Sequence, residues 1–378
     1  MKIMLYCQHV LGIGHFFRSM RLAAAMDRHE VLFVEGGLPL EGFAPPPHVR
    51  RVFLPPLMMD AEFKTMDALG EDEEMVKERR KDLLMQFFRD FAPDVLLVEL
   101  YPFGRKKFAF ELLPILDAIR KGDAPAKVVC SLRDILVEKE DQAAYEEKVI
   151  KTLNACFHLL LVHSDGELIR LDETFSRVAD IRIPVRYTGY VLQAAPRPIR
   201  KDHGKEIVAS SGGGRVGVGL LESVIRAVKM FDDPAVRLRI FIGPFMEEKD
   251  RDGLARIVSG DARIALCPFA ADFAETLAGA DLSISMAGYN TCMDILASGV
   301  RALVHPFPQN REQAMRAARF AERGVLNVLE DLRPETVLRG IREELDGPRC
   351  ATREEPNINI SGAENTVAEI QGAFPEMH

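Results

Sequence analysis

Short apolar runs alternate with amphipathic segments along this chain, in one series through the first half and a second series through the second half. Strands that are continuously Val, Ile and Leu, with helices between them, are typical of a parallel sheet covered on both faces. In the first half, the expected strands cover residues 2–8, 30–35, 49–54, 94–99, 127–131 and 158–162. The expected helices include residues 16–26, 73–91, 108–120 and 141–156.

The second half begins the same alternation again. Its expected strands cover residues 206–210, 238–242, 263–266, 281–285, 301–305 and 325–328. Its expected helices cover residues 219–230, 247–258, 273–277, 291–297, 311–322 and 335–345. The sequence therefore predicts an α/β protein with two doubly wound parallel sheets in tandem.

The best linker is residues 191–204, which hold two prolines and a basic cluster. We therefore expect Rossmann-like domains at residues 1–190 and 205–356. Residues 357–378, helical from about Gly362, could cross back to the first domain. Doubly wound sheets bind ligands at the carboxyl ends of their strands, so a cleft between two facing sheets would be the default site.

Composition narrows the class of protein. The chain has 378 residues, of which 47% are hydrophobic and 28% charged, as expected for a globular protein of two domains. A net charge of −8 argues against a nucleic-acid partner. The six cysteines are scattered, without the clusters that bind metals, and no signal peptide or membrane span is evident. These features predict a cytoplasmic location.

One segment leaves contact with a membrane open. Residues 83–91 are amphipathic and follow the basic run Arg79, Arg80 and Lys81. Such a segment could lie on the inner face of a membrane as a peripheral contact. A stripe of this kind more commonly packs on its own sheet.

The first of three glycine loops follows the first strand and contains Gly12, Gly14 and His15. Glycines let the backbone approach a ligand, and a histidine at a helix start could act as a base or bind a phosphate. It could also simply cap or pack. The loop lacks a full GxGxxG, and only Glu35 ends the second strand with an acid, so a dinucleotide dehydrogenase is disfavoured.

The second loop follows the first strand of the second half and comprises Ser211, Gly212, Gly213, Gly214 and Arg215. Consecutive glycines cost backbone entropy, which favours a close approach to a phosphate or sugar over a merely loose turn. No Lys-Ser or Lys-Thr follows, so the loop is not a P-loop.

The third loop, residues 285–291, joins a buried strand to a helix. Its uncovered amides and the helix dipole suit a diphosphate, and Asp294 lies one turn inside the helix, within reach of a ribose hydroxyl. An ordinary strand–turn–helix unit, in which Gly288 only permits a close turn, is the alternative.

Taken together, several segments resemble a known family. Residues 212–214, 268–273, 285–299 and 306–313 occur in the order seen in family 28 glycosyltransferases of the GT-B fold, which include the N-acetylglucosaminyltransferase that completes lipid II. Residues 8–24, 35–39, 131–134, 162–165 and 187–191 resemble a subgroup of predicted glycosyltransferases. The resemblance implies two Rossmann-like domains facing a cleft, a nucleotide-sugar donor that we expect to be a UDP-sugar, and a sugar acceptor.

By position, the resemblance implies roles for single residues. Phe269 and Ala270 would meet the nucleobase, Asp294 the ribose, and Glu312 and Gln313 the donor sugar. The amides that would face the diphosphate belong to Ala287, Gly288, Tyr289, Asn290 and Thr291. The relatives carry two glutamines where this chain has Glu312 and Gln313, so an N-acetylhexosamine is in doubt. Met286 replaces a basic residue of the relatives, for which Arg215 or Arg311 could substitute.

The resemblance also implies inverting transfer without a metal or other cofactor. The pair Asp250 and Asp252 is interpreted as a solvated helix face. His15 is the first candidate for the base that deprotonates the acceptor hydroxyl, followed by Asp134 and Glu99.

Two alternatives to a glycosyltransferase stay open. A UDP-sugar hydrolase or epimerase is one, because the hydrolase of pseudaminic acid synthesis has a similar Gly-x-Gly-His-x-x-Arg opening, and a non-catalytic nucleotide-sugar-binding protein is the other.

Overall fold

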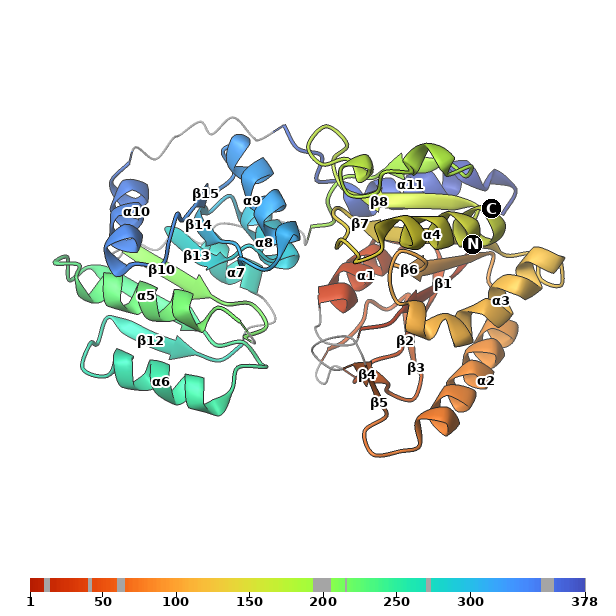
Figure 1. Cartoon of the computed structure of the whole chain (residues 1–378), viewed down its shortest axis with the longest axis horizontal. Helices are drawn as coiled ribbons and strands as arrows, with labels where there is room; N and C mark the ends of the chain where they lie inside the picture. The colour runs from red at the N-terminus through yellow and green to blue at the C-terminus, as the bar shows by residue number, and fades with distance from the viewer. Residues whose placement is uncertain are drawn as a thin grey trace. The chain divides into compact units, whose positions relative to one another are not determined.

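The chain folds into two compact units, shown in Figure 1. The computed structural model describes residues 1–9, 14–39, 43–59, 65–192, 205–214, 216–269, 273–347 and 357–377. The first unit is Met1–Val191 together with Ile358–His378, and the second is Leu192–Asn357. Of the expected linker, residues 193–204 lie outside the described residues.

The first unit is built on a seven-stranded parallel sheet in the order β3-β2-β1-β6-β7-β8-β9. Its strands are β1 (Lys2–Cys7), β2 (Glu30–Glu35), β3 (Val49–Phe53), β6 (Val95–Glu99), β7 (Lys127–Arg133), β8 (Leu159–His163) and β9 (Val185–Tyr187). A separate antiparallel pair joins β4 (Met58–Met59) and β5 (Met66–Asp67). The strand order reverses between β1 and β6, as in a Rossmann sheet.

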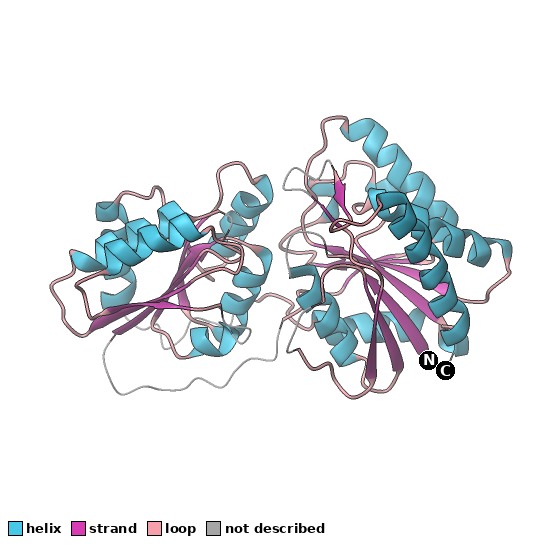
Figure 2. Cartoon of the chain, turned by 90° about the horizontal axis from the view of Figure 1, so that it is seen from below, coloured by secondary structure: helices cyan, strands magenta, loops and turns pink. Residues whose placement is uncertain are grey.

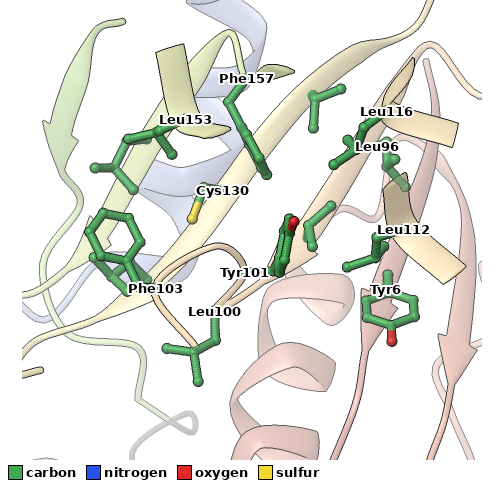
Figure 3. Close-up of a cluster of buried hydrophobic side chains, with 14 of the residues drawn as sticks. Tyr6, Leu96, Leu100, Tyr101, Phe103, Leu112, Leu116, Cys130, Leu153 and Phe157 are labelled. Atoms are coloured by element: carbon green, nitrogen blue, oxygen red, sulfur yellow. The ribbon is translucent and has the colours of Figure 1, made fainter. Parts of the chain in front are cut away.

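Helices cover both faces of this sheet, as Figure 2 shows. They are α1 (Gly14–Ala25), α2 (Glu73–Phe91), α3 (Ala109–Lys121), α4 (Gln142–Cys156) and α11 (Gly362–Ala373), with short 3-10 turns η1 (Lys106–Phe108), η2 (Leu171–Glu173), η3 (Val178–Asp180) and η4 (Pro375–Met377). Alternate strand residues point to opposite faces. One set forms a core with α2, α3 and α4 (Figure 3), and the other packs against α1 and α11.

The C-terminal segment is part of the first unit. The amide of Gly362 donates to the carbonyl of Tyr190 at 3.0 Å, and Ser361 forms a bridge with Val191. A Cβ at Gly362 would lie 2.4 Å from the carbonyl oxygen of Gly189, so only glycine fits there. Helix α11 then buries Ile370 against the sheet.

The second unit is a six-stranded parallel sheet in the order β12-β11-β10-β13-β14-β15. Its strands are β10 (Lys205–Ser210), β11 (Val236–Phe241), β12 (Ile264–Cys267), β13 (Leu282–Met286), β14 (Arg301–His305) and β15 (Asn327–Val328). Its helices are α5 (Val218–Lys229), α6 (Glu248–Val258), α7 (Phe273–Ala278), α8 (Tyr289–Ser298), α9 (Arg311–Glu322) and α10 (Pro334–Asp346). The order reverses between β10 and β13, so both sheets are doubly wound and the predicted fold class is confirmed.

The amphipathic stripe of α2 faces the core of its own unit. Leu84, Phe88 and Phe91 are buried there, and the remaining apolar side chains of residues 83–87 pack against the same core. Arg80 is wholly buried and ion-paired with Glu111, so the basic run at residues 79–81 is not a continuous surface patch. No helix in the described ranges has both the length and the apolar character needed to cross a membrane.

His163, at the end of β8, is buried as a neutral side chain. Its Nε2 lies 2.7 Å from Ser131 Oγ and its Nδ1 2.9 Å from Thr188 Oγ1. Burial, assisted by the charge of Arg18, lowers the pKa of His163 from 6.5 to about 3. In the unfolded chain the same histidine takes up a proton near pH 6.5, whereas the folded state excludes it.

The sign of this difference predicts acid destabilisation. As the pH falls from 6.5 toward 3, His163 should lower the free energy of unfolding by up to about 1.4 kcal/mol per pH unit. We expect His163→Gln, whose amide can replace both hydrogen bonds, to reduce that slope. Urea unfolding at pH 7.5, 6 and 5 measures it. An unchanged slope in the folded variant would show that His163 is not excluded from protonation.

Candidate functional site

The residues expected to act chemically lie mainly at the carboxyl ends of the strands beside the two reversals of strand order. In the first unit these are β1 and β6, and in the second unit β10 and β13. Ligands of doubly wound sheets bind outside the carboxyl ends of the strands at such a reversal, because the adjacent connections leave there in opposite directions. The two units are described separately.

In the first unit, His15 and Glu99 form a hydrogen-bonded pair. His15 lies in the first turn of α1, and Glu99 is the last residue of β6. His15 Nδ1 is 2.7 Å from Glu99 Oε1, and Arg18 Nη2 donates to the same oxygen. In the neutral imidazole, Nδ1–H donates to the carboxylate, which leaves Nε2 as an acceptor. Glu99 is 1% exposed, while 21% of the His15 side chain is accessible.

The electrostatics keep His15 neutral and Glu99 charged at neutral pH. Burial is the main cause that lowers the pKa of His15 to about 4; Arg105 and Arg18 act in the same direction, and Glu99 opposes them. Burial would raise the pKa of Glu99, but His15, Arg18 and Arg105 hold it below its usual range. A neutral imidazole oriented by a carboxylate is the arrangement of a general base.

The other two candidates for the base differ from His15. Glu99 is ion-paired with Arg18, which suits it to orienting His15 better than to accepting a proton. Asp134 follows β7, is wholly buried, and accepts a hydrogen bond from the amide of Ile135 at 2.9 Å. Gly14 is the first residue of α1, and Gly12 lies outside the described residues. The structure thus brings together His15 and Glu99, and it adds Arg18, the arginine of the Gly-x-Gly-His-x-x-Arg opening, to which the sequence pattern assigned no role.

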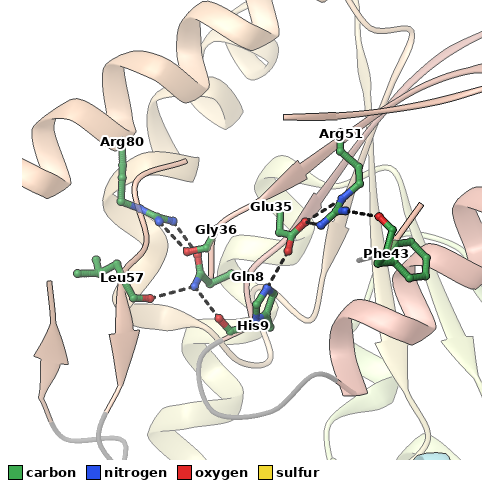
Figure 4. A network of polar contacts seen from close by, with 8 residues as sticks. All are labelled: Gln8, His9, Glu35, Gly36, Phe43, Arg51, Leu57 and Arg80. Atoms are coloured by element: carbon green, nitrogen blue, oxygen red, sulfur yellow. Dashed lines mark hydrogen bonds and ion pairs between the residues drawn. The ribbon is translucent and has the colours of Figure 1, made fainter. Parts of the chain in front are cut away.

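Glu35, the acid at the end of β2, already has partners. Arg51 binds its Oε2 through Nε at 3.2 Å and Nη2 at 2.7 Å, and His9 Nε2 lies 3.2 Å from Oε1 (Figure 4). Glu35 is fully buried. A ribose hydroxyl would have to displace these groups, so the geometry also disfavours a dinucleotide site of the dehydrogenase kind.

In the second unit, the glycine loop after β10 contains one glycine that packing requires and one with open space around it. A Cβ at Gly214 would lie 3.0 Å from backbone atoms of Gly243, so Gly214 is needed where two loops touch. Gly212 has a φ of +67°, and a Cβ there would meet nothing within 4 Å. Packing therefore explains Gly214, whereas the open space at Gly212 permits a ligand to approach the backbone closely. Arg215 lies outside the described residues.

The loop between β13 and α8 has a glycine that the fold does not require. Gly288 is the N-cap of α8 with φ −66° and ψ 152°, which any residue can adopt. A Cβ there would meet only Thr291 Oγ1, at 4.0 Å. The absence of a side chain at Gly288 is therefore not a packing requirement, and it leaves the first amides of α8 accessible.

Three buried side-chain oxygens around these loops have no hydrogen-bond partner in the part of the chain that the structure describes. They are Ser211 Oγ, Ser285 Oγ and Asn290 Oδ1. Buried polar groups are almost always hydrogen-bonded, so unpartnered oxygens on neighbouring segments call for an explanation. A polar ligand at the carboxyl ends of β10 and β13 would supply the missing partners.

Two further expected residues flank this site. Asp294 lies in α8 and is 8% exposed. Phe269 follows β12, and 43% of it is exposed, which leaves its ring open to a planar partner. Ala270, the expected neighbour of the nucleobase, lies outside the described residues.

Arg316 is a buried cation that the sequence pattern did not reveal as part of the site. Its Nη2 donates to Glu312 Oε1 at 2.8 Å, and its guanidinium lies 5.2 Å from the ring centre of Tyr289. Arg316 is fully buried, whereas Arg311, expected to supply a charge, is exposed. Gln313 accepts a hydrogen bond from the amide of Phe307 at 3.0 Å. The i, i+4 spacing of Glu312 and Arg316 was the available signal.

Part of the sequence, most of it in the second unit, matches a known family. Residues 213–370 match the glycosyltransferase family 28 C-terminal domain. An uncharacterized glycosyltransferase of Methanosarcina acetivorans is 21% identical over 96% of this chain and 94% of its own length. The UDP-N-acetylglucosamine–N-acetylmuramyl-(pentapeptide) pyrophosphoryl-undecaprenol N-acetylglucosamine transferase 1 of Bacillus cereus is 26% identical over 37% of this chain and 40% of its own length.

Solved structures share the fold over nearly the whole chain. MurG of Acinetobacter baumannii has a TM-score of 0.58 at 15% identity, covering 98% of this chain and 99% of its own. A Listeria monocytogenes protein named as a UDP-N-acetylglucosamine 2-epimerase has a TM-score of 0.70 at 16% identity, with 99% and 97% covered. TcCGT1 in complex with UDP has a TM-score of 0.65 at 13% identity, with 100% and 99% covered. At these identities the likeness concerns the fold, which is GT-B.

Proposed function

Because the chain is a glycosyltransferase of the GT-B fold that resembles family 28, we propose that it transfers a sugar from a UDP-sugar to a hydroxyl acceptor with inversion and without a metal. The acceptor class we propose is a lipid-linked or polysaccharide precursor, since the Bacillus cereus relative is named for a pyrophosphoryl-undecaprenol substrate. The corresponding location is the cytoplasm, with peripheral contact at the inner face of the membrane.

The observation that carries the proposal is the group of unpartnered oxygens beside the start of α8. Ser211, Ser285 and Asn290 lie on segments of the family 28-like unit that meet at the carboxyl ends of β10 and β13, next to the open Gly288. The N-terminus of α8 adds amides and a positive dipole, which favour a diphosphate. A nucleoside diphosphate matches this combination, and the fold relative TcCGT1 was solved with UDP.

The chemistry follows from where negative charge develops. The bond between the sugar carbon and the diphosphate oxygen breaks, and both bonding electrons leave with UDP. Amides of residues 287–291 would stabilise that charge without reorganisation. A new bond forms between the acceptor oxygen and the sugar carbon from the opposite side, which inverts the configuration. His15 Nε2 would take the acceptor proton, and Glu99 would stabilise the resulting imidazolium.

Asp294→Asn is expected to weaken UDP binding by about tenfold or more while the fold stays intact. A hydrogen bond from a ribose hydroxyl to a charged acceptor contributes about 1.5–3 kcal/mol, and the amide lacks the charge. Titration calorimetry with UDP measures the change. Asp252→Asn, on an exposed position of α6, is the matched control and should leave the dissociation constant unchanged. Equal affinity in wild type and Asp294→Asn would remove Asp294 from the site.

A donor screen tests the function itself. A bound UDP-sugar should raise the melting temperature. At a hundredfold excess over its dissociation constant, the ligand adds about 2.7 kcal/mol to the free energy of unfolding. Incubation with UDP-N-acetylglucosamine or UDP-glucose and no acceptor should leave the bound sugar largely uncleaved. Rapid complete hydrolysis would instead identify a hydrolase, and an epimer an epimerase. Tight binding without transfer to any acceptor would identify a binding protein.

A further inference from the structure

Basic side chains follow the carboxyl ends of β6 and β7, and one of them, Arg105, lies close enough to the His15–Glu99 pair to act on both charges. Arg105 and Lys106 belong to the segment after β6, while Arg133 ends β7 and Lys139 follows it. Among the described residues, Arg105, Lys106 and Lys139 form no ion pair with a carboxylate. The mechanism proposed above does not use these residues.

Arg105 is held in an unfavourable backbone conformation. Its φ is +57°, and Leu100 at the start of the same loop has a φ of +66°. Non-glycine residues rarely adopt the left-handed region, and those that do collect at functional sites. The Nε of Arg105 is buried and has no hydrogen-bond partner within the described ranges. A buried donor without a partner, on a strained loop, indicates that a ligand completes the site.

The two lysines are fixed against one aromatic ring. Lys106 Nζ lies 4.4 Å and Lys139 Nζ 6.0 Å from the ring centre of Tyr145, whose hydroxyl donates to the carbonyl of Phe103 at 2.8 Å. Burial and then the neighbouring cations lower the pKa values of both lysines. Cations that repel one another destabilise the free protein, and a bound anion would relieve that repulsion.

Arg105 also acts electrostatically on the proposed base. It lowers the pKa of both His15 and Glu99, so its charge lies close to the place where the acceptor hydroxyl would be deprotonated. An anion held by Arg105 would therefore sit near the reacting hydroxyl and within the same unit.

Resting on the proposed transferase function, we propose that the acceptor carries an anionic group, a phosphate or a carboxylate, close to the hydroxyl that receives the sugar. Arg105 binds this group, and Lys106 and Lys139 surround it with positive charge. The anion thus selects the acceptor and places its hydroxyl at His15 Nε2. Arg105 is a binding and positioning residue in this scheme.

The test titrates the full chain with two anions by calorimetry, with and without saturating UDP. The probes are sn-glycerol 3-phosphate and glucuronate, and glycerol and glucose are their uncharged counterparts. We expect one anion to bind at least about tenfold more tightly than its counterpart, and its identity distinguishes phosphate from carboxylate. Arg105→Gln should weaken that binding by about tenfold or more and leave the affinity for UDP unchanged.

Lys121→Gln is the matched control. Lys121 is exposed at the end of α3, which leads to the amino end of β7 and away from the carboxyl ends of the strands, so its loss should change neither affinity. If circular dichroism shows that Arg105→Gln does not fold, Lys106→Gln on the exposed side of the cluster replaces it with the same expectations.

Three outcomes would overturn the proposal. They are no binding of either anion, anion binding that the substitution leaves unchanged, and a fall in UDP affinity, which would assign Arg105 to the donor. A wild-type protein that does not bind UDP would count against the proposed donor instead, and the anion titration without UDP would still decide this inference.

Discussion

Replacing His15 with Ala should lower the turnover number by about a hundredfold or more, the usual scale for losing a general base. The affinity for UDP should barely change, because the donor is assigned to the second unit and His15 belongs to the first. The expected loss of turnover follows from the hydrogen bond of 2.7 Å between His15 Nδ1 and Glu99, which leaves His15 Nε2 as the acceptor. Steady-state kinetics with a true acceptor and calorimetry with UDP measure the two quantities.

Other roles of His15 would give different results. A histidine that only touched the donor phosphate would lower affinity and turnover together, and Asp134 or Glu99 would become the better base. A packing residue would lower the melting temperature and leave the rate of the folded variant near normal. That last result would end the catalytic assignment of His15.

Arg80→Met should lower the free energy of unfolding by about 3–5 kcal/mol, because it leaves the carboxylate of Glu111 buried without its cation. Arg80 donates to Glu111 from Nε at 2.7 Å and from Nη2 at 2.6 Å. It also donates to Gln8 Oε1 at 2.6 Å, and its Nη1 reaches the carbonyl of Gly36 at 2.8 Å. Figure 4 shows Arg80 directed at Gln8 and Gly36. Urea unfolding at neutral pH measures the loss.

The neighbouring Arg79 offers a matched control. Both side chains of its ion pair with Glu71 are exposed, so Arg79→Met should change the free energy of unfolding by less than about 1 kcal/mol. The double variant Arg80→Met with Glu111→Gln should recover part of the loss, since the uncompensated charge is gone. A loss at Arg80 no larger than at Arg79 would show that Glu111 is protonated or hydrated in the fold.

The fold could be predicted from the chain because buried parallel strands need continuous apolar runs. Strand β14 and helices α2 and α9 begin and end where the pattern predicted, at residues 301–305, 73–91 and 311–322. Strand β9 was missed, since its Val185–Tyr187 segment at the sheet edge alternates exposed and half-buried residues and carries Arg186. An edge strand has one neighbour and little apolar character, so its pattern is weak.

The site was only partly predictable. The loops at residues 211–214 and 285–291 could be placed after buried strands because such turns are visible in the sequence, and their role in binding stays a prediction. The burial of Arg80 was not predicted, because its partner Glu111 is far along the chain. The sequence assigned no role to Arg18 or Arg316 for a related reason, because the contacts of an arginine on a helix are known only once the fold is known.

The first unit is made from two stretches of chain, with the whole second unit inserted between them. During synthesis from the N-terminus, residues 192–357 are therefore available for folding before the residues of α11 emerge. Until then, the face of the first sheet that Ile370 and Phe374 cover stays incomplete. The second unit can therefore fold first, and the unit bearing His15 is completed last by α11. Truncation within α11 should therefore affect the unit that bears His15, although the removed residues, within 362–373, are far from residue 15 in the sequence.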